Sequence, residues 1–362
     1  MVETIRLESG HTLTGIVGSN PTLSAMFFSP LQWLSHLGSA TPWRLILSIG
    51  TAILSTCLLA SSQQPAPPAT QPAANETNAQ SLAIWITARD HDDKPSELSA
   101  SDLQVKIDGK PASVSDTRRL RPGLCYCLLL DNSGSTRHTL QAQKDRATAL
   151  LSTIPQAGRD YGVLVNFNDS AYVDAEGTDP KKLLKALDKA GSRGGTALYD
   201  AMIACSDLLS KHDLPKNDLS KNDLSKSPLD ALRLMFIFSD GDDNASNVSL
   251  EAVEHAVISA QVRVYALEEK DTASPNTSVR TRGPETLRRL SEISGGKHFP
   301  PGKKMEPEQI AADISADLAS LYAVTLTSDQ TLTAGRFYKL EVKSGRKNIA
   351  ITAPRQYFVP AR

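Results

Sequence analysis

The sequence CYCLLLDNSGS occupies residues 125–135 and decides the fold class. Its first six residues are hydrophobic without interruption, and a run of that kind is typical of a strand buried on both faces of a parallel sheet. Acidic and hydroxyl residues follow at once, at Asp131, Ser133 and Ser135. In an open α/β fold, ligands bind outside the carboxyl ends of such strands. The stretch therefore predicts both a buried strand and a ligand site where it ends.

Short apolar runs alternate with segments of helical length through most of the remaining chain. Further strands are predicted at residues 162–167, 234–238, 262–267 and 321–326, and helices at residues 139–153, 180–189, 197–210, 250–259, 284–293 and 307–320. Buried strands that alternate with amphipathic helices predict an α/β fold, with a doubly wound, mostly parallel sheet and helices on both of its faces.

Shorter strands flank this region. Residues 82–88 and 103–107 precede it, and residues 337–342 and 348–352 follow it. The later pair are candidates for pairing with the earlier pair, although the sequence alone does not decide this. Residues 211–230 repeat with a period of five (KHDLP-KNDLS-KNDLS-KSPLD), which matches neither a helix nor a strand and predicts a solvated, low-complexity insert.

Five segments follow from these patterns. Residues 1–62 form a leader, and the uncharged apolar stretch 45–60 within it suits a signal peptide or a minimal membrane anchor, whichever of Met1 and Met26 is the true start. After it come a Pro-rich linker at 63–80, an N-terminal β segment at 81–117, the α/β domain at 118–328 and a C-terminal β segment at 329–362. The leader predicts an exported protein that is periplasmic, at the cell surface or secreted, with or without a membrane anchor.

The composition excludes several classes of protein. Lys and Arg number 39 against 40 Asp and Glu, so a net charge of −1 argues against binding to nucleic acid. Four cysteines are too few for a disulfide scaffold. Of these, Cys125, Cys127 and Cys205 are expected to act as buried small hydrophobes. A bridge from Cys205 to one of the other two is the alternative.

Oxygen donors occur at three points of the predicted α/β domain that a doubly wound sheet brings to one edge. They are Asp131, Ser133 and Ser135 after the first strand, Thr196 just before a helix, and Asp240 after residues 234–238. Carboxylates and hydroxyls without thiolate or imidazole suit Mg²⁺, Mn²⁺ or Ca²⁺ and disfavour Zn²⁺. Two carboxylates neutralise a divalent ion, which can then accept one more anionic oxygen. This donor set predicts binding to a partner that supplies an Asp or Glu carboxylate.

Asp131-x-Ser133-x-Ser135, Thr196 and Asp240 resemble, in order and context, the metal-ion-dependent adhesion site of von Willebrand factor type A domains. More narrowly, the sequence is similar to a related group catalogued in acidobacterial genomes, through residues 86–110, 194–200 and 337–357. The resemblance covers about residues 81–360. It implies direct metal contacts from Ser133, Ser135 and often Thr196, with Asp131 and Asp240 partly through water. It also implies adhesion to a protein partner rather than catalysis.

Two other functions stay open: a metal-assisted hydrolase of phosphate esters, and a structural A domain without a functional metal site. Haloacid-dehalogenase-type phosphatases use an aspartate as general acid where Ser133 stands here, and a serine cannot protonate a leaving group. His138 reads as a partly exposed residue of a first helical turn rather than a base. Residues 168–169 and 242–244 favour solvated loops over a second cation site. The purely structural interpretation of the loop after the first strand is that Ser135 or Thr136 caps the N-terminus of the following helix.

Overall fold

The structure is a computed structural model that describes residues 5–6, 80–212, 231–270, 282–302 and 306–360. The apolar stretch 45–60, nearly all of the linker and most of the repeat at 211–230 lie outside the described residues. Among the helices of the described ranges, none is both long and apolar enough to cross a membrane.

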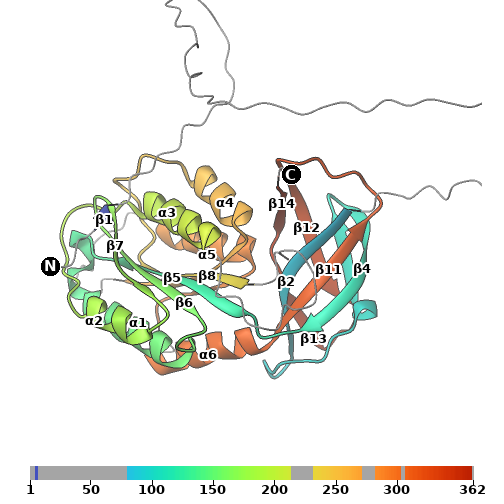
Figure 1. Cartoon of the computed structure of the whole chain (residues 1–362), viewed down its shortest axis with the longest axis horizontal. Coiled ribbons are helices and arrows are strands. Elements are labelled where there is room, and N and C mark those ends of the chain that lie inside the picture. Colours follow the sequence, from blue (N-terminus) through green and yellow to red (C-terminus); the bar gives the residue numbers. More distant parts are fainter. Residues whose placement is uncertain (1–4, 7–79, 213–230, 271–281, 303–305, 361–362) are drawn as a thin grey trace, which may run out of the picture. The chain divides into compact units, whose positions relative to one another are not determined.

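The first sheet is mostly parallel, as the sequence predicts. Its strand order is β1-β7-β6-β5-β8-β9-β10. Figure 1 labels β1, β7, β6, β5 and β8 of this sheet. Five neighbouring strands run parallel: β6 (Tyr161–Phe167), β5 (Gly123–Asp131), β8 (Ala231–Ser239), β9 (Val262–Glu268) and β10 (Lys297–Phe299). At one edge, β7 (Ala171–Gly177) pairs antiparallel with β6, and the two-residue β1 (Ile5–Arg6) pairs antiparallel with β7. The sequence does not predict β1, β7 or the short parallel strand β10.

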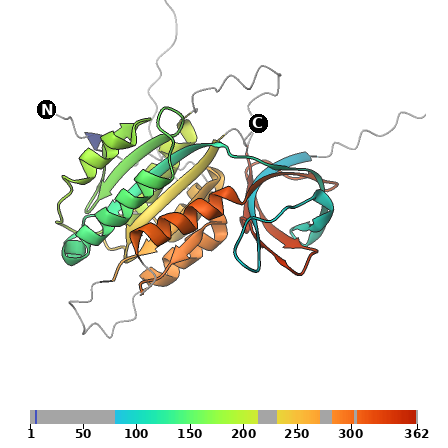
Figure 2. The same cartoon turned by 90° about the horizontal axis from the view of Figure 1, so that it is seen from below.

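Helices cover both faces of this sheet (Figure 2). On one face are α1 (Leu140–Thr153), α2 (Pro180–Leu187) and α6 (Pro307–Ala319), and on the other are α3 (Leu198–Lys211), α4 (Leu250–Ser259) and α5 (Gly283–Ser294). Alternate residues of β5 enter the two cores, with Leu128 on the first face and Cys127 and Leu129 on the second. The predicted doubly wound α/β class is confirmed.

The second sheet is antiparallel and strongly curved (Figure 2), with the order β13-β2-β11-β4-β3-β12-β14. Its strands are β2 (Gln80–Asp90), β3 (Leu103–Ile107), β4 (Lys110–Arg119), β11 (Leu321–Ser328), β12 (Arg336–Ser344), β13 (Ile349–Thr352) and β14 (Gln356–Val359). Because β12 pairs with β3 and β13 with β2, the pairing between the flanking strands is confirmed.

The prediction that residues 321–326 belong to the parallel sheet is wrong. This strand, β11, lies between β2 and β4 and is antiparallel to both. Leu321 and Ala323 pack into a core of the α/β domain, whereas Tyr322, Val324 and Leu326 face the core of the second sheet. Burial from two sides makes the strand apolar at consecutive positions, and such a run looks the same in the sequence as a strand of a parallel sheet.

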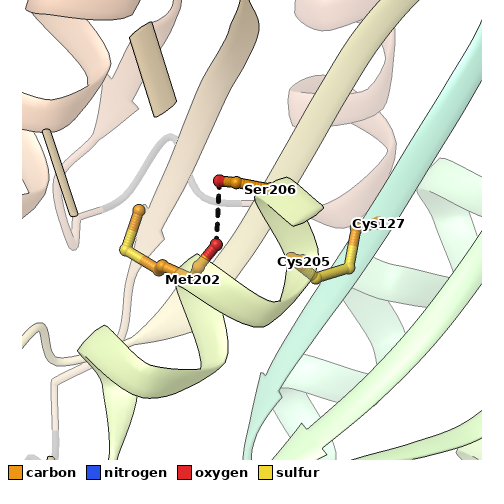
Figure 3. Close-up of a disulfide and its surroundings, with 4 residues drawn as sticks. All are labelled: Cys127, Met202, Cys205 and Ser206. Atoms are coloured by element: carbon orange, nitrogen blue, oxygen red, sulfur yellow. Dashed lines mark hydrogen bonds between the residues drawn. A yellow bond between two sulfur atoms is a disulfide. The ribbon is translucent and has the colours of Figure 1, made fainter. Parts of the chain in front are cut away.

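A disulfide joins Cys127 of β5 to Cys205 of α3 (Figure 3), with Cα atoms 6.3 Å apart. The expectation that these cysteines are only buried hydrophobes is therefore wrong, because helix α3 crosses the face of β5 on which Cys127 lies. Cys125 is a free, buried cysteine on the same strand, and burial raises the pKa of its thiol to about 12.

Candidate metal centre

Two candidate carboxylates lie at the carboxyl ends of neighbouring strands. Strands β5 and β8 are parallel and paired up to Leu130↔Phe238, so Asp131 ends one strand while Asp240 directly follows the other. Asp131 is fully buried and Asp240 is half-buried. The parallel pairing thus brings together two acids that stand more than a hundred residues apart in the sequence.

Hydrogen bonds hold both oxygens of Asp131. Its Oδ1 accepts from the backbone nitrogen of Ser133 at 3.0 Å, and its Oδ2 accepts from the hydroxyl of Ser239 at 2.6 Å. Burial raises the pKa of Asp131, and the hydrogen bonds from Ser133 and Ser239 oppose that rise. The carboxylate is therefore held in one orientation but is costly to ionise without a cation nearby.

The hydroxyls of Ser133 and Ser135 form an oxygen pair at the mouth of the site. Ser133 is buried, Ser135 is exposed, and their Oγ atoms are 2.9 Å apart. Adjacent ligands of an octahedral Mg²⁺ at 2.0–2.1 Å lie about 2.9 Å from each other, so this spacing fits two neighbouring positions on one ion. The donor chemistry and the spacing both suit a hard divalent cation.

The hydroxyl of Thr136 stabilises the same loop from inside. It donates to the carbonyl oxygens of Asp131 and Ser133, both at 2.9 Å. The short helix η2 (Gly134–His138) has Ser133 at its N-cap, and α1 has Thr139. A cap formed by Ser135 or Thr136 is therefore not what the structure shows. His138 is exposed within η2, as the sequence indicates.

The loop before Thr196 lies directly against the Asp131–Ser135 loop. The backbone nitrogen of Gly134 donates to Gly194 O at 2.9 Å, and that of Arg193 donates to Asn132 O at 2.8 Å. A Cβ atom on Gly134 would lie 3.2 Å from Gly194 O, so glycine permits this close approach. Thr196, which is buried, follows two residues later.

Two polar residues that we interpreted as parts of solvated loops instead form hydrogen bonds with the loop that carries Thr196. Asn244 Oδ1 accepts from the backbone nitrogen of Thr196 at 2.9 Å, and the Asn244 nitrogen donates to Thr196 O at 3.0 Å. Asp169 Oδ1 accepts from the Gly195 nitrogen at 2.7 Å. Asn168 is buried rather than solvated. Their positions just after strand ends are the only signal of this role in the sequence.

Negative charge accumulates around Asp240. Burial is the main reason that its pKa is raised to about 6, and the charges of Asp131 and Asp242 raise it further. The Asp242 nitrogen donates a hydrogen bond to Asp240 Oδ1 at 3.0 Å, which lowers the pKa of Asp240 but offsets only part of the rise. A bound cation would relieve both the desolvation and the repulsion.

This raised pKa makes the stability of the metal-free protein depend on pH. Between pH 3.8 and about 6 the folded state keeps a proton on Asp240 that the unfolded state has released, so this stabilising contribution is lost as pH rises through that window. Asp240→Asn, which carries no charge, should therefore match the wild type at pH 4 and exceed its melting temperature at pH 7.5. Thermal melts in metal-free buffer measure the difference; one that does not change with pH contradicts the prediction.

In the part of the chain that the structure describes, no group of three or more His, Cys, Asp and Glu side chains is arranged to hold a metal. The candidate centre instead combines two carboxylates with three hydroxyls, from Asp131, Ser133, Ser135, Thr196 and Asp240. Such a set is too poor in charge and in nitrogen or sulfur for a structural zinc site and fits a weakly held hard cation.

Comparison with known proteins gives one family assignment within the chain. Residues 126–242 match the family model described as the von Willebrand factor type A domain. The matched range begins in β5 and ends two residues after Asp240, so it contains all five candidate metal ligands. No curated protein matches the sequence.

Several solved structures are similar to the chain at low identity. A von Willebrand factor type A protein from Catenulispora acidiphila is 10% identical with a TM-score of 0.41, and the match covers 78% of this chain and 75% of that one. An aerotolerance-related membrane protein from Bacteroides fragilis is 14% identical with a TM-score of 0.41, over 54% and 98% of the two chains. The conserved hypothetical protein BatB from Bacteroides thetaiotaomicron is 15% identical with a TM-score of 0.39, over 53% and 98%. These values carry no information about a ligand or a partner.

Proposed function

The chain contains a von Willebrand factor type A domain, and from that premise we propose that it binds a protein partner through a divalent cation, Mg²⁺ or else Mn²⁺ or Ca²⁺. Five side chains would hold the ion: Asp131, Ser133, Ser135, Thr196 and Asp240. The observation that carries the proposal is the 2.9 Å spacing of the Ser133 and Ser135 hydroxyls in the loop that follows β5, where the neighbouring strands β5 and β8 end in carboxylates.

The charges of the site support a partner carboxylate. Asp131 and Asp240 supply two negative charges, and the hydroxyl donors supply none. The two carboxylates would neutralise a divalent cation bound there, and the cation would keep one coordination position open for an anionic oxygen. Among the five proposed ligands, Ser135 is the exposed residue. The open coordination position therefore faces the protein surface next to Ser135. An Asp or Glu of the partner would complete the coordination.

We propose that the domain acts outside the cytoplasm and is not an enzyme. The disulfide between Cys127 and Cys205 supports export, because such bonds persist mainly in oxidising compartments. Ser133 has no acidic proton to give to a leaving group, and His138, the histidine closest in sequence to the site, is exposed on η2. The predicted signal peptide or anchor at residues 45–60 and the narrower acidobacterial similarity stay predictions.

Metal-dependent stability tests the site in the full-length chain. At a Mg²⁺ or Mn²⁺ concentration about 100 times the Kd, linkage predicts about 2.7 kcal/mol of stabilisation, or roughly 5–10 °C in melting temperature. Asp131→Asn keeps the shape of the side chain but removes its charge, and it should reduce the shift to about 1 °C or less. Asp145→Asn, on the exposed side of α1, is the matched control and should keep the full shift.

Each alternative function has its own outcome in this test. If neither ion stabilises the wild type, the metal site is wrong and a structural A domain remains. If the wild type hydrolyses p-nitrophenyl phosphate with Mg²⁺ or Mn²⁺ and Asp131→Asn does not, the hydrolase is correct. Partner capture from an envelope extract should depend on the cation and be lost in chelator; capture that chelator leaves unchanged contradicts the proposed mode of binding.

A further inference from the structure

Ser239 lies between the two candidate carboxylates but is not one of the proposed ligands. It is the last residue of β8, it is fully buried, and it directly precedes Asp240. The pairing of β8 with β5 ends at Leu130↔Phe238, which brings Ser239 next to Asp131. Its side chain contacts the Asp131 carboxylate and the backbone turn that carries Asp240.

The hydrogen bonds of Ser239 have a defined direction. Its Oγ is 3.0 Å from the backbone nitrogen of Gly241, which can only donate. The hydroxyl therefore accepts from Gly241, and its single proton is free to be donated to Asp131 Oδ2 at 2.6 Å. A donor to an ionised carboxylate forms a short, charge-assisted bond, and the observed distance fits one.

This bond complements the one from the carboxylate's own loop. Asp131 Oδ1 is held by the nitrogen of Ser133, within the same loop, whereas Oδ2 is held from the neighbouring strand. Two bonds to different oxygens fix the rotation of the carboxylate plane. Without Ser239, the carboxylate would lose the bond from the neighbouring strand and would be restrained only by Ser133 within its own loop, so the ligand geometry that Mg²⁺ demands would be held less firmly.

The same hydroxyl shapes the turn that carries Asp240. The bond from the Gly241 nitrogen back to Ser239 Oγ spans Asp240, and Gly241 has a φ of +82°. A side chain at Gly241 would collide with the backbone of Gly283, so the turn is closely packed on its other side. The backbone of Asp240 is thus held between the Ser239 hydroxyl and the start of α5.

We propose that Ser239 is a positioning residue of the metal centre, which orients Asp131 through Oδ2 and sets the turn of Asp240 without touching the ion. This inference rests on the proposed metal-binding function. Outer-sphere hydrogen-bond partners of metal ligands commonly control affinity in this manner.

Calorimetric titration of the full-length chain with Mn²⁺ tests the assignment. Ser239→Ala is expected to raise the Kd about 10- to 100-fold, as is typical when an outer-sphere partner is removed. Ser239→Thr keeps the hydroxyl and should bind within about threefold of the wild type. If Ser239→Ala does not fold at the titration temperature, Ser239→Cys replaces it with the same expected loss, because a thiol has similar volume but donates weakly.

Ser206→Ala is the matched control. Ser206 is also a buried serine, but its hydroxyl donates to Met202 O at 2.9 Å inside α3 (Figure 3). Measured in chelator, this variant should be less stable than the wild type. It should still bind Mn²⁺ with the wild-type affinity. Wild-type affinity in Ser239→Ala, or an equal loss in Ser206→Ala, overturns the positioning role. If the wild type itself shows no saturable Mn²⁺ binding, the proposed metal-binding function is wrong, whatever the Ser239 variants do.

Discussion

Loss of the disulfide is expected to cost the domain about 4.5 kcal/mol of unfolding free energy when Cys127 and Cys205 are both replaced by alanine. The bond closes a chain segment with a sequence separation of 78, and the loop-closure relation gives about 4.5 kcal/mol for that length at 25 °C. For a domain of this size the melting temperature should fall by roughly 10–18 °C. Urea unfolding of the full-length chain under non-reducing conditions measures the change.

Cys125→Ala is the matched control for that experiment. Cys125 lies on the same strand, is equally buried and is free, so its replacement removes core volume without opening a cross-link. It should cost about 1 kcal/mol, as a small core substitution does. Alkylation of the unfolded, unreduced chain should label Cys125 but neither bridged cysteine. Labelling of all three, or equal costs for the two sets of variants, would contradict the disulfide.

The bridge also connects two parts of the candidate site. β5 carries Cys127 and ends at Asp131, while α3 carries Cys205 and begins two residues after Thr196. Opening of the bridge would leave those two loops held by the hydrogen bonds around Gly134 and Gly194. The disulfide therefore stabilises the elements that present the candidate ligands rather than a remote part of the fold.

The second large effect is expected at Asp317, a buried carboxylate near the end of α6. Its Oδ2 accepts from the hydroxyl of Tyr265 at 2.5 Å and from Arg263 at 3.4 Å, and its Oδ1 lies 3.7 Å from Arg89 Nε. Arg263 also donates to the carbonyl oxygen of Trp85 in β2. Residues of both sheets therefore meet at one carboxylate.

Asp317→Ala should destabilise the chain by about 3–5 kcal/mol, because it leaves the buried Arg263 and Arg89 without this charge partner. Asp313→Ala is the matched control, one turn earlier on the same helix. Asp313 pairs with Lys297 at 2.7 Å near the surface, and such a pair contributes about 0–1 kcal/mol. Urea unfolding distinguishes the variants. A cost below about 1 kcal/mol for Asp317→Ala, or one equal to that of Asp313→Ala, would rule out the buried cluster as a major source of stability.

Much of the α/β domain could be predicted because its signals are local. Each of the six predicted helices begins and ends within two residues of its place in the structure. The parallel strands stand out because burial on both faces makes them continuously apolar. Residues 321–326 show where this reasoning fails: the run is equally apolar, but it lies between two cores and belongs to the antiparallel sheet.

The candidate ligands could be named from the sequence for a related reason. Each follows a strand or precedes a helix, and the connections of a doubly wound sheet bring those points to one edge. The residues that hold the ligands in place could not be named. Ser239 acts on Asp131 from 108 positions away, and Asn244 acts on Thr196 from 48 positions away. Contacts at such separations leave no periodic pattern in the sequence.

The sequence by itself determined the class of the fold, its helices, four of its five parallel strands and the oxygen-rich edge of the sheet, because each depends on the order of polar and apolar residues along a short stretch. Only the tertiary structure decided that Cys127 pairs with Cys205, that β11 leaves the parallel sheet, and that Ser239 holds Asp131. These features depend on which elements come to lie side by side. Which elements become neighbours is decided by how the faces of helices and sheets pack against one another. Each residue contributes to that packing, but no short stretch of sequence shows the result.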